Sequence, residues 1–260
     1  MNNKVYTHEF IDIRGAKRPQ YMHHMTANWS PIAQEERHQL CFGVWGVVGT
    51  TDRWPRVINM WEEDGFPGLA AGLGHETGRP NMQDAKLEKW WNEAAGYRKG
   101  GFDRVMIPAP WTRTIEELNA DGVRGEVYAH EMVTLAPGTA AAFLEIVRAE
   151  MVPAYAGAGL ELVSAMRTSM RDESECILIW AIPSWPAWAK FELAINKVSD
   201  PGDVEVLDEA AAKPLRDWQQ RLYSQSRSFR RFLMLDAPLS PLRIGRQPAR
   251  SDRVDSWDEG

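Results

Sequence analysis

The chain has 260 residues, 44% of them hydrophobic, and a formal net charge of −6 at pH 7. Its apolar content suffices for one large domain or two small ones. Acidic and basic residues are mixed without a basic stripe, which argues against a nucleic-acid partner. The N-terminus lacks the apolar segment of a signal peptide, and no apolar run approaches the length of a membrane span. We therefore expect a soluble cytoplasmic protein with no membrane partner.

In the first half, alternating runs rich in β-branched and aromatic residues predict four strands. They cover residues 5–14, 40–48, 56–62 and 102–107. A helix with an apolar face follows the first strand, and Pro31 kinks it or starts a new turn. The Gly- and Pro-rich segment 66–81 predicts a loop or a short helix. A second helix over 84–99 is expected to stop at Gly100-Gly101.

The second half predicts the same order of elements. Its strands are expected at 126–135, 160–170, 176–182 and 229–235. Helices are expected to begin at Pro137-Gly138, near Pro186 and, after an acidic linker (199–209), at 210–226. The tail that follows Pro241 is charged and is expected to wrap the surface or to be disordered.

Four sequence blocks recur in the same order in the two halves, so the chain is a tandem repeat. They are Val5-Tyr6-Thr7-His8-Glu9 with Val127-Tyr128-Ala129-His130-Glu131, Met60-Trp61 with Ile179-Trp180, Trp90 with Trp218, and 106–110 with 234–238. Each half reads β-α-β-β-α-β, the ferredoxin-like order. We expect an α+β protein whose two repeats, 1–115 and 123–240, pack sheet to sheet as a barrel and precede a charged C-terminal tail, 241–260.

The second copy opens with VYAHEMVTLAPGTAAAFLEIV, in which a Leu-Ala-Pro-Gly turn separates a strand from an amphipathic helix. This pattern resembles NIPSNAP-type domains of the dimeric α/β-barrel superfamily, over residues 4–240. The resemblance implies a barrel and a homodimer, although a tandem chain can also close its own barrel. Glu131 and Val133, like Glu9 and Ile11, stand where the family commonly has Arg and Tyr. No ligand is therefore carried over from those positions.

The pairs His8-Glu9 and His130-Glu131 are the leading catalytic candidates. Neighbouring residues on a strand point to opposite faces, so either the His or the Glu of each pair enters a cavity. A buried Glu has a raised pKa and can act as a base near neutral pH, where a His already titrates. Alternatively, both pairs are relics of the duplication that pin the first strand to a loop. His24 and His75 are expected to assist, or else to be a solvated or capping His and part of a plain loop.

No spacing of the six histidines suits a metal ion, and no metal or organic cofactor is expected. Haem enzymes occur in the same superfamily, and a haem would have to use His130. Cys41 and Cys176 lie in apolar runs and predict buried thiols.

The 12 tryptophans predict an aromatic core or an aromatic-lined pocket for a small apolar molecule. The residues expected to bind it are Tyr6, Trp45, Trp61, Tyr128, Trp180, Trp185 and Trp188. The halves differ at Asn59, which becomes Leu178, and at Glu62-Glu63, which becomes Ala181-Ile182. This difference suggests that one half holds the site and the other is scaffold.

We expect an enzyme of small-molecule catabolism or secondary metabolism that acts on an aromatic or terpenoid-like substrate by cofactor-independent acid–base chemistry. Lyase, isomerase and oxygenase reactions all remain open, because the fold does not choose among them. The alternatives are a non-catalytic hydrophobic-ligand-binding or adaptor protein and a haem-binding member of the superfamily.

Overall fold

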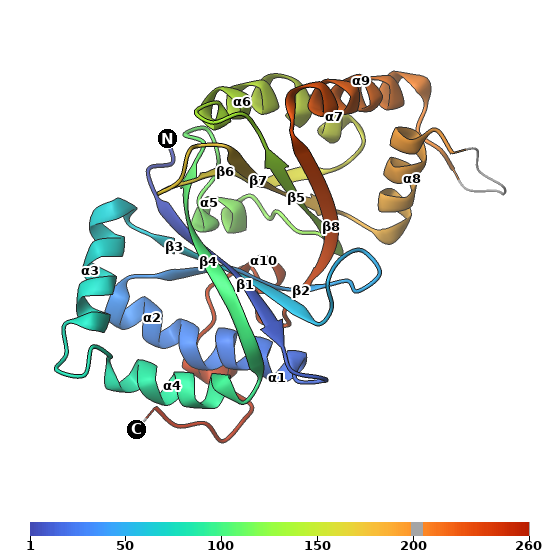
Figure 1. Ribbon diagram of the computed structural model, residues 1–260. Helices are drawn as coiled ribbons and strands as arrows, with labels where there is room; N and C mark the ends of the chain where they lie inside the picture. Colours follow the sequence, from blue (N-terminus) through green and yellow to red (C-terminus); the bar gives the residue numbers. More distant parts are fainter. Residues whose placement is uncertain (199–204, 260) are drawn as a thin grey trace. The chain divides into compact units, whose positions relative to one another are not determined.

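The computed structural model describes residues 1–198 and 205–259, and it divides into two compact units (Figure 1). One unit comprises Met1–Gly122 and Met234–Gly260, and the other comprises Val123–Leu233. Part of the predicted linker, 199–204, lies outside the described residues. Among the residues described, no helix combines the length and the apolar character that crossing a membrane requires.

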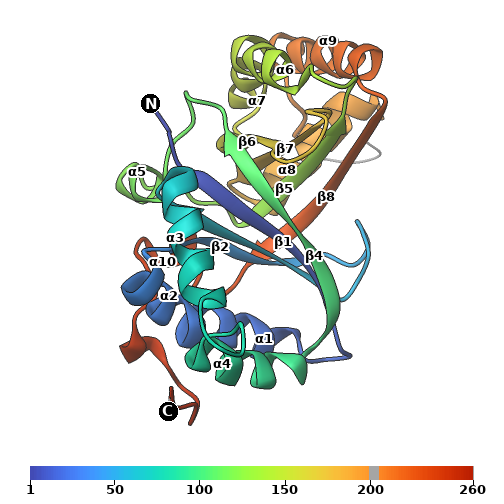
Figure 2. The ribbon, with the colours of Figure 1, turned by 60° about the vertical axis from the view of Figure 1, so that its left-hand side comes forward.

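The first unit is built on an antiparallel sheet in the order β4-β1-β3-β2. Its strands are β1 (Val5–Ile13), β2 (Leu40–Val47), β3 (Arg56–Glu63) and β4 (Arg98–Pro108). Helices α1 (Arg18–His23) and α2 (Ser30–Arg37), the intervening π-helical turn η1 (His24–Trp29), and α4 (Ala85–Ala95) lie along one face of this sheet (Figure 2). Helix α3 (Gly65–Thr77) follows β3, and α5 (Ile115–Ala120) follows β4.

Proline placement and side-chain capping explain where two helices of this unit begin. Pro31 lies in the first turn of α2, where its missing N–H breaks no helical hydrogen bond. The carboxylate of Asp84 caps α4 by accepting hydrogen bonds from the backbone N–H groups of Lys86 (3.0 Å) and Leu87 (3.1 Å). The segment predicted as a loop or short helix is the helix α3 over much of its length.

The predicted helix stop at Gly100-Gly101 is wrong. Helix α4 ends at Ala95, and both glycines lie inside β4, opposite Asp12 and Ile11 of β1. A Cβ atom on Gly101 would lie 2.3 Å from the carbonyl oxygen of Phe10. The glycine therefore permits a close approach of two strands rather than a helix end.

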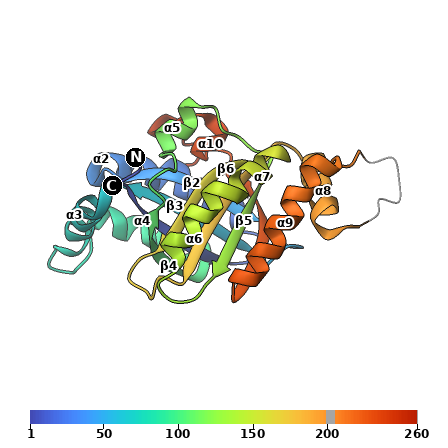
Figure 3. The same ribbon diagram turned by 90° about the horizontal axis from the view of Figure 1, so that it is seen from above.

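The second unit repeats the order of the first, β8-β5-β7-β6. Its strands are β5 (Val127–Thr134), β6 (Glu161–Thr168), β7 (Glu175–Ile182) and β8 (Ser228–Asp236), and the last residues of β8 belong to the first unit. Its helical elements are α6 (Ala140–Ile146), η2 (Val147–Met151), α7 (Val152–Gly157), α8 (Trp185–Asn196) and α9 (Glu209–Gln225). Figure 3 shows α8 and α9 side by side. The prediction of an α+β fold made of two ferredoxin-like repeats is confirmed.

The two repeats also share backbone irregularities. A π-helical turn interrupts the first helix of each, at η1 and at η2. The second strand of each shifts its register, between Cys41 and Gly43 in β2 and between Leu162 and Ser164 in β6. The copies therefore match in geometry as well as in sequence.

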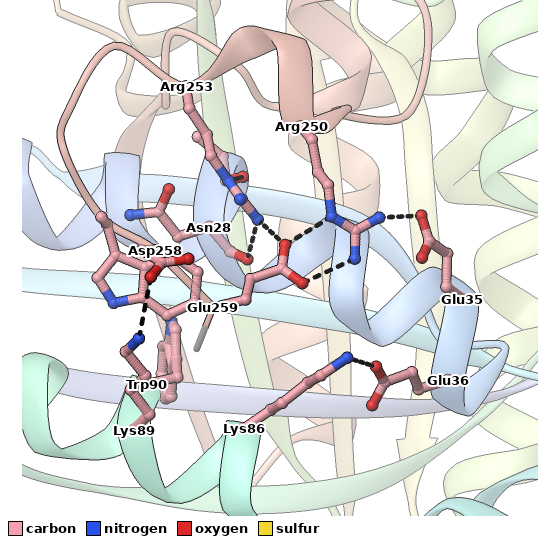
Figure 4. Close-up of polar contacts among 12 residues, drawn as sticks. Asn28, Glu35, Glu36, Lys86, Lys89, Trp90, Arg250, Arg253, Asp258 and Glu259 are labelled. Carbon is pink, nitrogen blue, oxygen red and sulfur yellow. Dashed lines mark hydrogen bonds and ion pairs between the residues drawn. The ribbon is translucent and has the colours of Figure 1, made fainter.

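The C-terminal tail follows the surface of the first unit through α10 (Pro241–Ile244) and a short turn, η3 (Arg250–Asp252). Figure 4 shows Arg250 and Arg253 both reaching Glu259, while Arg250 also pairs with Glu35 of α2. Trp257 packs against the core of the unit. The tail wraps the surface, one of its two predicted states.

Candidate active site

A cavity of about 230 Å³ lies between the sheet of the first unit and its helices. The sheet contributes mostly polar side chains: Thr7, Glu9, Trp61, Glu63, Arg98 and Asp103. The helices contribute mostly apolar or aromatic ones, among them Met25, Trp29, Leu69, Leu87, Trp90 and Trp91. Such a mixture of aromatic walls and a few polar groups is typical of small-molecule sites.

Glu9 is the central polar residue of this cavity. Its Oε2 accepts hydrogen bonds from Asn59 Nδ2 (2.8 Å) and from Trp61 Nε1 (3.1 Å). Asp103 stands directly opposite Glu9 on β4. Burial raises the pKa of Glu9 to about 7, helped by the charge of Asp103 and opposed by the two hydrogen bonds. Burial also raises the pKa of Asp103. The two carboxyl groups titrate as a pair, as neighbouring acids do.

Glu63 is a second buried carboxyl group in the cavity. Its Oε1 accepts hydrogen bonds from Gln39 Nε2 (2.7 Å) and Thr7 Oγ1 (3.1 Å). Its Oε2 has no hydrogen-bond partner within the described part of the chain, although the residue is only 3% exposed. Burial raises its pKa to about 7 as well. One carboxyl oxygen in the wall of the cavity thus lacks a protein hydrogen-bond partner among the described residues.

Aromatic rings hold the helical wall in place. Trp90 stacks on His24 with ring centroids 5.2 Å apart, and Trp29 and Trp91 each lie 5.4 Å from Trp90. His24 and Trp90 are also joined by two hydrogen bonds, from His24 Nε2 to the Trp90 carbonyl (3.1 Å) and from Trp90 Nε1 to the His24 carbonyl (3.2 Å). His24 therefore supports the wall from behind and does not line the cavity.

The second unit surrounds the same glutamate differently. Glu131 Oε1 accepts hydrogen bonds from Arg231 Nε (2.7 Å) and Tyr155 Oη (3.0 Å), and its Oε2 accepts one from Trp180 Nε1 (3.0 Å). Arg231 and Asp103 occupy the same place in the repeat, three residues before the matched Met234 and Met106. The second unit thus has an ion pair, Glu131 with Arg231, at the place where the first unit has two carboxyl groups, Glu9 and Asp103.

The other polar positions of the cavity also lose their polarity in the second unit. Matched residues follow from the shared strand pairing. Thr7 becomes Ala129, Asn59 becomes Leu178, and Glu63 becomes Ile182. The second unit keeps the fold and has apolar side chains at these three positions, beside the Glu131–Arg231 ion pair. This pattern places the candidate site in the first unit.

The predicted histidines lie away from the cavity. His8 is fully buried on the opposite face of β1, with its ring centroid 4.9 Å from that of Phe10, and burial lowers its pKa to about 3. His130 is fully buried and stacks on Phe232 at 4.5 Å. His75 lies 3.4 Å from Asp84. In the first His-Glu pair, therefore, the Glu enters the cavity.

Of the predicted aromatic residues, Trp61 lines this cavity. Trp180 is its counterpart beside Glu131. Tyr6 and Trp45 are fully buried, and Tyr6 Oη donates a hydrogen bond to Glu62 (2.8 Å). The remaining three are Tyr128, whose Oη accepts a hydrogen bond from Gly125 N (3.1 Å), and the partly exposed Trp185 and Trp188 of α8. Asp103 was not predicted from the sequence, although aligning the last strands of the two halves would have set it against Arg231.

Two other arrangements of side chains bear on cofactor binding. Donor atoms of Glu36, His75 and Asp84 lie within 4.8 Å of one another, but Lys86, Arg37 and Arg79 pair with the same carboxylates. This arrangement is an ion-pair network and does not fit a metal ion. His130 does not fit an axial haem ligand, because its ring is fully buried and stacked on Phe232.

No family model matches the sequence, and neither does any curated protein. Several solved structures do match. An anthrone oxidase-like protein is 8% identical and aligns over 90% of this chain and 92% of its own, with a TM-score of 0.55. A putative monooxygenase from Lactobacillus acidophilus is 9% identical over 96% and 97%, with a TM-score of 0.54. A putative monooxygenase from Fusobacterium nucleatum is 7% identical over 90% and 92%, with a TM-score of 0.53.

At these identities the likeness shows the fold alone. The chain shares its fold with these structures, and membership in the dimeric α/β-barrel superfamily stays a prediction. Membership in the NIPSNAP family within it stays a prediction.

Proposed function

We propose that the cavity of the first unit is the active site of an enzyme that removes a proton from a small aromatic substrate, with Glu9 as the base. The observation that carries this proposal is the exchange of Arg231 for Asp103 opposite the matched glutamate. A buried ion pair fixes a carboxylate in its charged form, whereas a second acid lets it exchange a proton near neutral pH. A base is most effective when its pKa is close to the working pH.

Each neighbour of Glu9 has a role in this mechanism. Asn59 and Trp61 donate hydrogen bonds to Oε2 and orient the carboxylate. Burial, and after it the charge of Asp103, raises the pKa of Glu9, so that the proton taken from the substrate can be held and then released. Trp90 and Trp91 line the cavity and provide apolar aromatic surface against which a substrate ring can pack.

The substrate class that suits this site is an aromatic compound with an acidic C–H or O–H group. Removing the proton from anthrone, for example, leaves a carbanion that molecular oxygen can oxidise. Anthrone and one O₂ give anthraquinone and one water, which balances atoms and electrons. The names of the structural neighbours, monooxygenase and anthrone oxidase-like protein, support an oxygenase over a lyase or isomerase.

A non-catalytic ligand-binding protein is the alternative. Such a protein is expected to pair every buried polar group, because an unpaired one costs stability. The free Oε2 of Glu63 and the raised pKa of Glu9 favour the enzyme instead.

Anthrone provides a direct test. The full-length protein is expected to exchange the acidic C–H of anthrone with D₂O faster than buffer does, and to consume O₂ in proportion to the anthraquinone formed. Glu9→Gln is expected to lose both activities. An equal exchange rate in Glu9→Gln, or no exchange above buffer across a panel of aromatic C–H and O–H acids, contradicts the proposal.

A further inference from the structure

Arg37 is a buried cation whose hydrogen-bonding capacity is unused. It is the last residue of α2 and lines the same cavity. Its side chain is only 4% exposed. None of its three guanidinium nitrogens has a hydrogen-bond partner among residues 1–198 and 205–259. A guanidinium group offers five N–H donors, and leaving them unpaired in the interior is costly.

The described residues around Arg37 do not accept hydrogen bonds from its guanidinium group. An Asp84 carboxylate oxygen lies 3.8 Å away, beyond hydrogen-bond distance. The carboxylate of Glu76, which lines the same cavity, attracts Arg37 more strongly but forms no hydrogen bond with it. Asp84 already accepts two backbone hydrogen bonds at the start of α4 and lies within 3.7 Å of Arg79. The guanidinium carbon lies 4.6 Å from the ring centroid of Trp29. The Trp29 ring therefore holds the guanidinium in place without using its in-plane donors.

Arg37 also lies at a distance from the base. It precedes Leu40 by three residues, and Leu40 pairs with Glu62 of β3, whereas Glu9 pairs with Asn59. Asn59 and Glu62 are three residues apart along β3, which corresponds to about 10 Å at roughly 3.3 Å per residue. Arg37 therefore lies toward the Glu63 end of the cavity, whereas the pair of Glu9 and Asp103 lies further along the sheet, where Arg98 interacts with both carboxyl groups.

The second unit lacks this cation, as it lacks the carboxyl pair. Leu40 of β2 pairs with Glu62, and Glu161 of β6 pairs with Ala181, the counterpart of Glu62. Glu161 is therefore the counterpart of Leu40. Three residues before Glu161 stands Ala158. Arg37 and Asp103 are therefore both features of the unit that holds the cavity.

The geometry points to a substrate that carries a carboxylate, bound by Arg37 while its aromatic ring lies between the tryptophans and its reacting atom faces Glu9. The role of Glu9 here rests on the proposed function. The planar fork of a guanidinium matches a carboxylate with two parallel hydrogen bonds. A carboxylate would supply the acceptors that the described residues do not offer to Arg37.

The test compares 1-naphthoate, 1-naphthamide and 1-naphthyl phosphate by calorimetric titration of the full-length protein. Wild type is expected to bind the naphthoate at least about 10-fold more tightly than the amide, the effect of a charge-assisted hydrogen bond. Arg37→Gln is expected to remove that preference, and Arg37→Lys to keep part of it. The melting temperature of Arg37→Gln is expected to equal or exceed that of wild type, because a buried cation whose N–H groups form no hydrogen bond to any described residue is removed.

Several results overturn the inference: equal binding of naphthoate and amide, tighter binding of the phosphate, no saturable naphthoate binding, or an unchanged preference in Arg37→Gln. Wild type alone decides the first three, so the test does not depend on a variant folding. Glu9→Gln separates this inference from the proposed function. A Glu9→Gln protein that keeps full proton exchange together with the carboxylate preference refutes the base and leaves the anion site standing.

Discussion

Glu9 and Asp103 stand directly opposite each other on the neighbouring antiparallel strands β1 and β4. In the second unit the corresponding residues, Glu131 and Arg231, form an ion pair with a 2.7 Å contact. Opposite charges across a strand pair attract, and like charges repel. In the first unit, burial and then the charge of Asp103 raise the pKa of Glu9 to about 7, so Glu9 is expected to hold a proton below that pH. The two units should therefore respond differently to substitution and to pH.

Glutamine substitution at the matched glutamates is expected to have opposite consequences. Glu9→Gln should reduce turnover by about 10²–10⁴-fold, the usual contribution of a general base, with little loss of stability. Glu131→Gln should leave Arg231 buried without its main partner, at a cost of about 3–5 kcal/mol. Steady-state kinetics and urea unfolding measure the two effects. Equal losses of activity in the two folded variants would refute the assignment of the site to the first unit.

Asp103→Asn is expected to lower the pKa of Glu9, because it removes the charge that opposes ionisation of Glu9. Burial remains the largest cause of the shift, so the pKa should fall only part of the way from about 7 toward its usual value. The acidic limb of the profile of kcat/KM against pH should move to lower pH. Asp103→Arg, which rebuilds the ion pair of the second unit, should move it further. If the acidic limb of this profile stays at the same pH in both variants, the charge at position 103 does not affect the pKa of Glu9.

Glu63 is expected to make stability fall as the pH rises. Its pKa is raised to about 7 in the folded state, so between its unfolded value and 7 the folded protein binds more protons than the unfolded chain. The free energy of unfolding therefore decreases with pH over that window. Glu63→Gln mimics the protonated form and should gain stability relative to wild type at pH 8 but not at pH 5. A constant difference at both pH values would show that Glu63 does not titrate there.

The C-terminal tail is expected to stabilise the first unit chiefly through Trp257. Its ring centroid lies 5.4 Å from that of His24, behind the aromatic wall of the cavity. Trp257→Ala should lower the free energy of unfolding by about 1–2 kcal/mol. Glu259→Gln, which weakens the partly buried pairs of Glu259 with Arg250 and Arg253 in Figure 4, should cost less than about 1 kcal/mol because Glu259 stays in contact with solvent. The reverse order of effects, measured by urea unfolding, would show that the ion pairs dominate.

Much of the fold was predictable because local patterns encode it. The alternation of Val5 to Ile11 located β1, and the matched blocks were enough to reveal the repeat. Gly100-Gly101 misled the prediction, since a glycine pair signals a helix end and a close strand contact equally well. The Gly content of segment 66–81 left a loop and a short helix both open, and the structure has the helix α3 there, because propensity is weaker than tertiary context.

The site was less predictable because it depends on strand register. Glu9 and Trp61 were named as candidates, but their partners Asn59 and Asp103 were separated from Glu9 by large stretches of sequence. Only the pairing of β1 with both β3 and β4 brings the three polar side chains together. His8 was an equal candidate on sequence grounds, since the alternation of a strand does not say which face meets the helices.

The shared π-helical turns and strand bulges have a historical consequence. Irregularities of this kind are retained within families, and finding them at the same points in both copies indicates that they were present in the ancestor before its gene was duplicated. The divergence of Asp103 from Arg231 then came afterwards, on an inherited backbone. The two units therefore present two sets of side chains on the same type of backbone. Exchanging the residues around Glu9 with those around Glu131 would separate the effect of side-chain chemistry from that of backbone geometry.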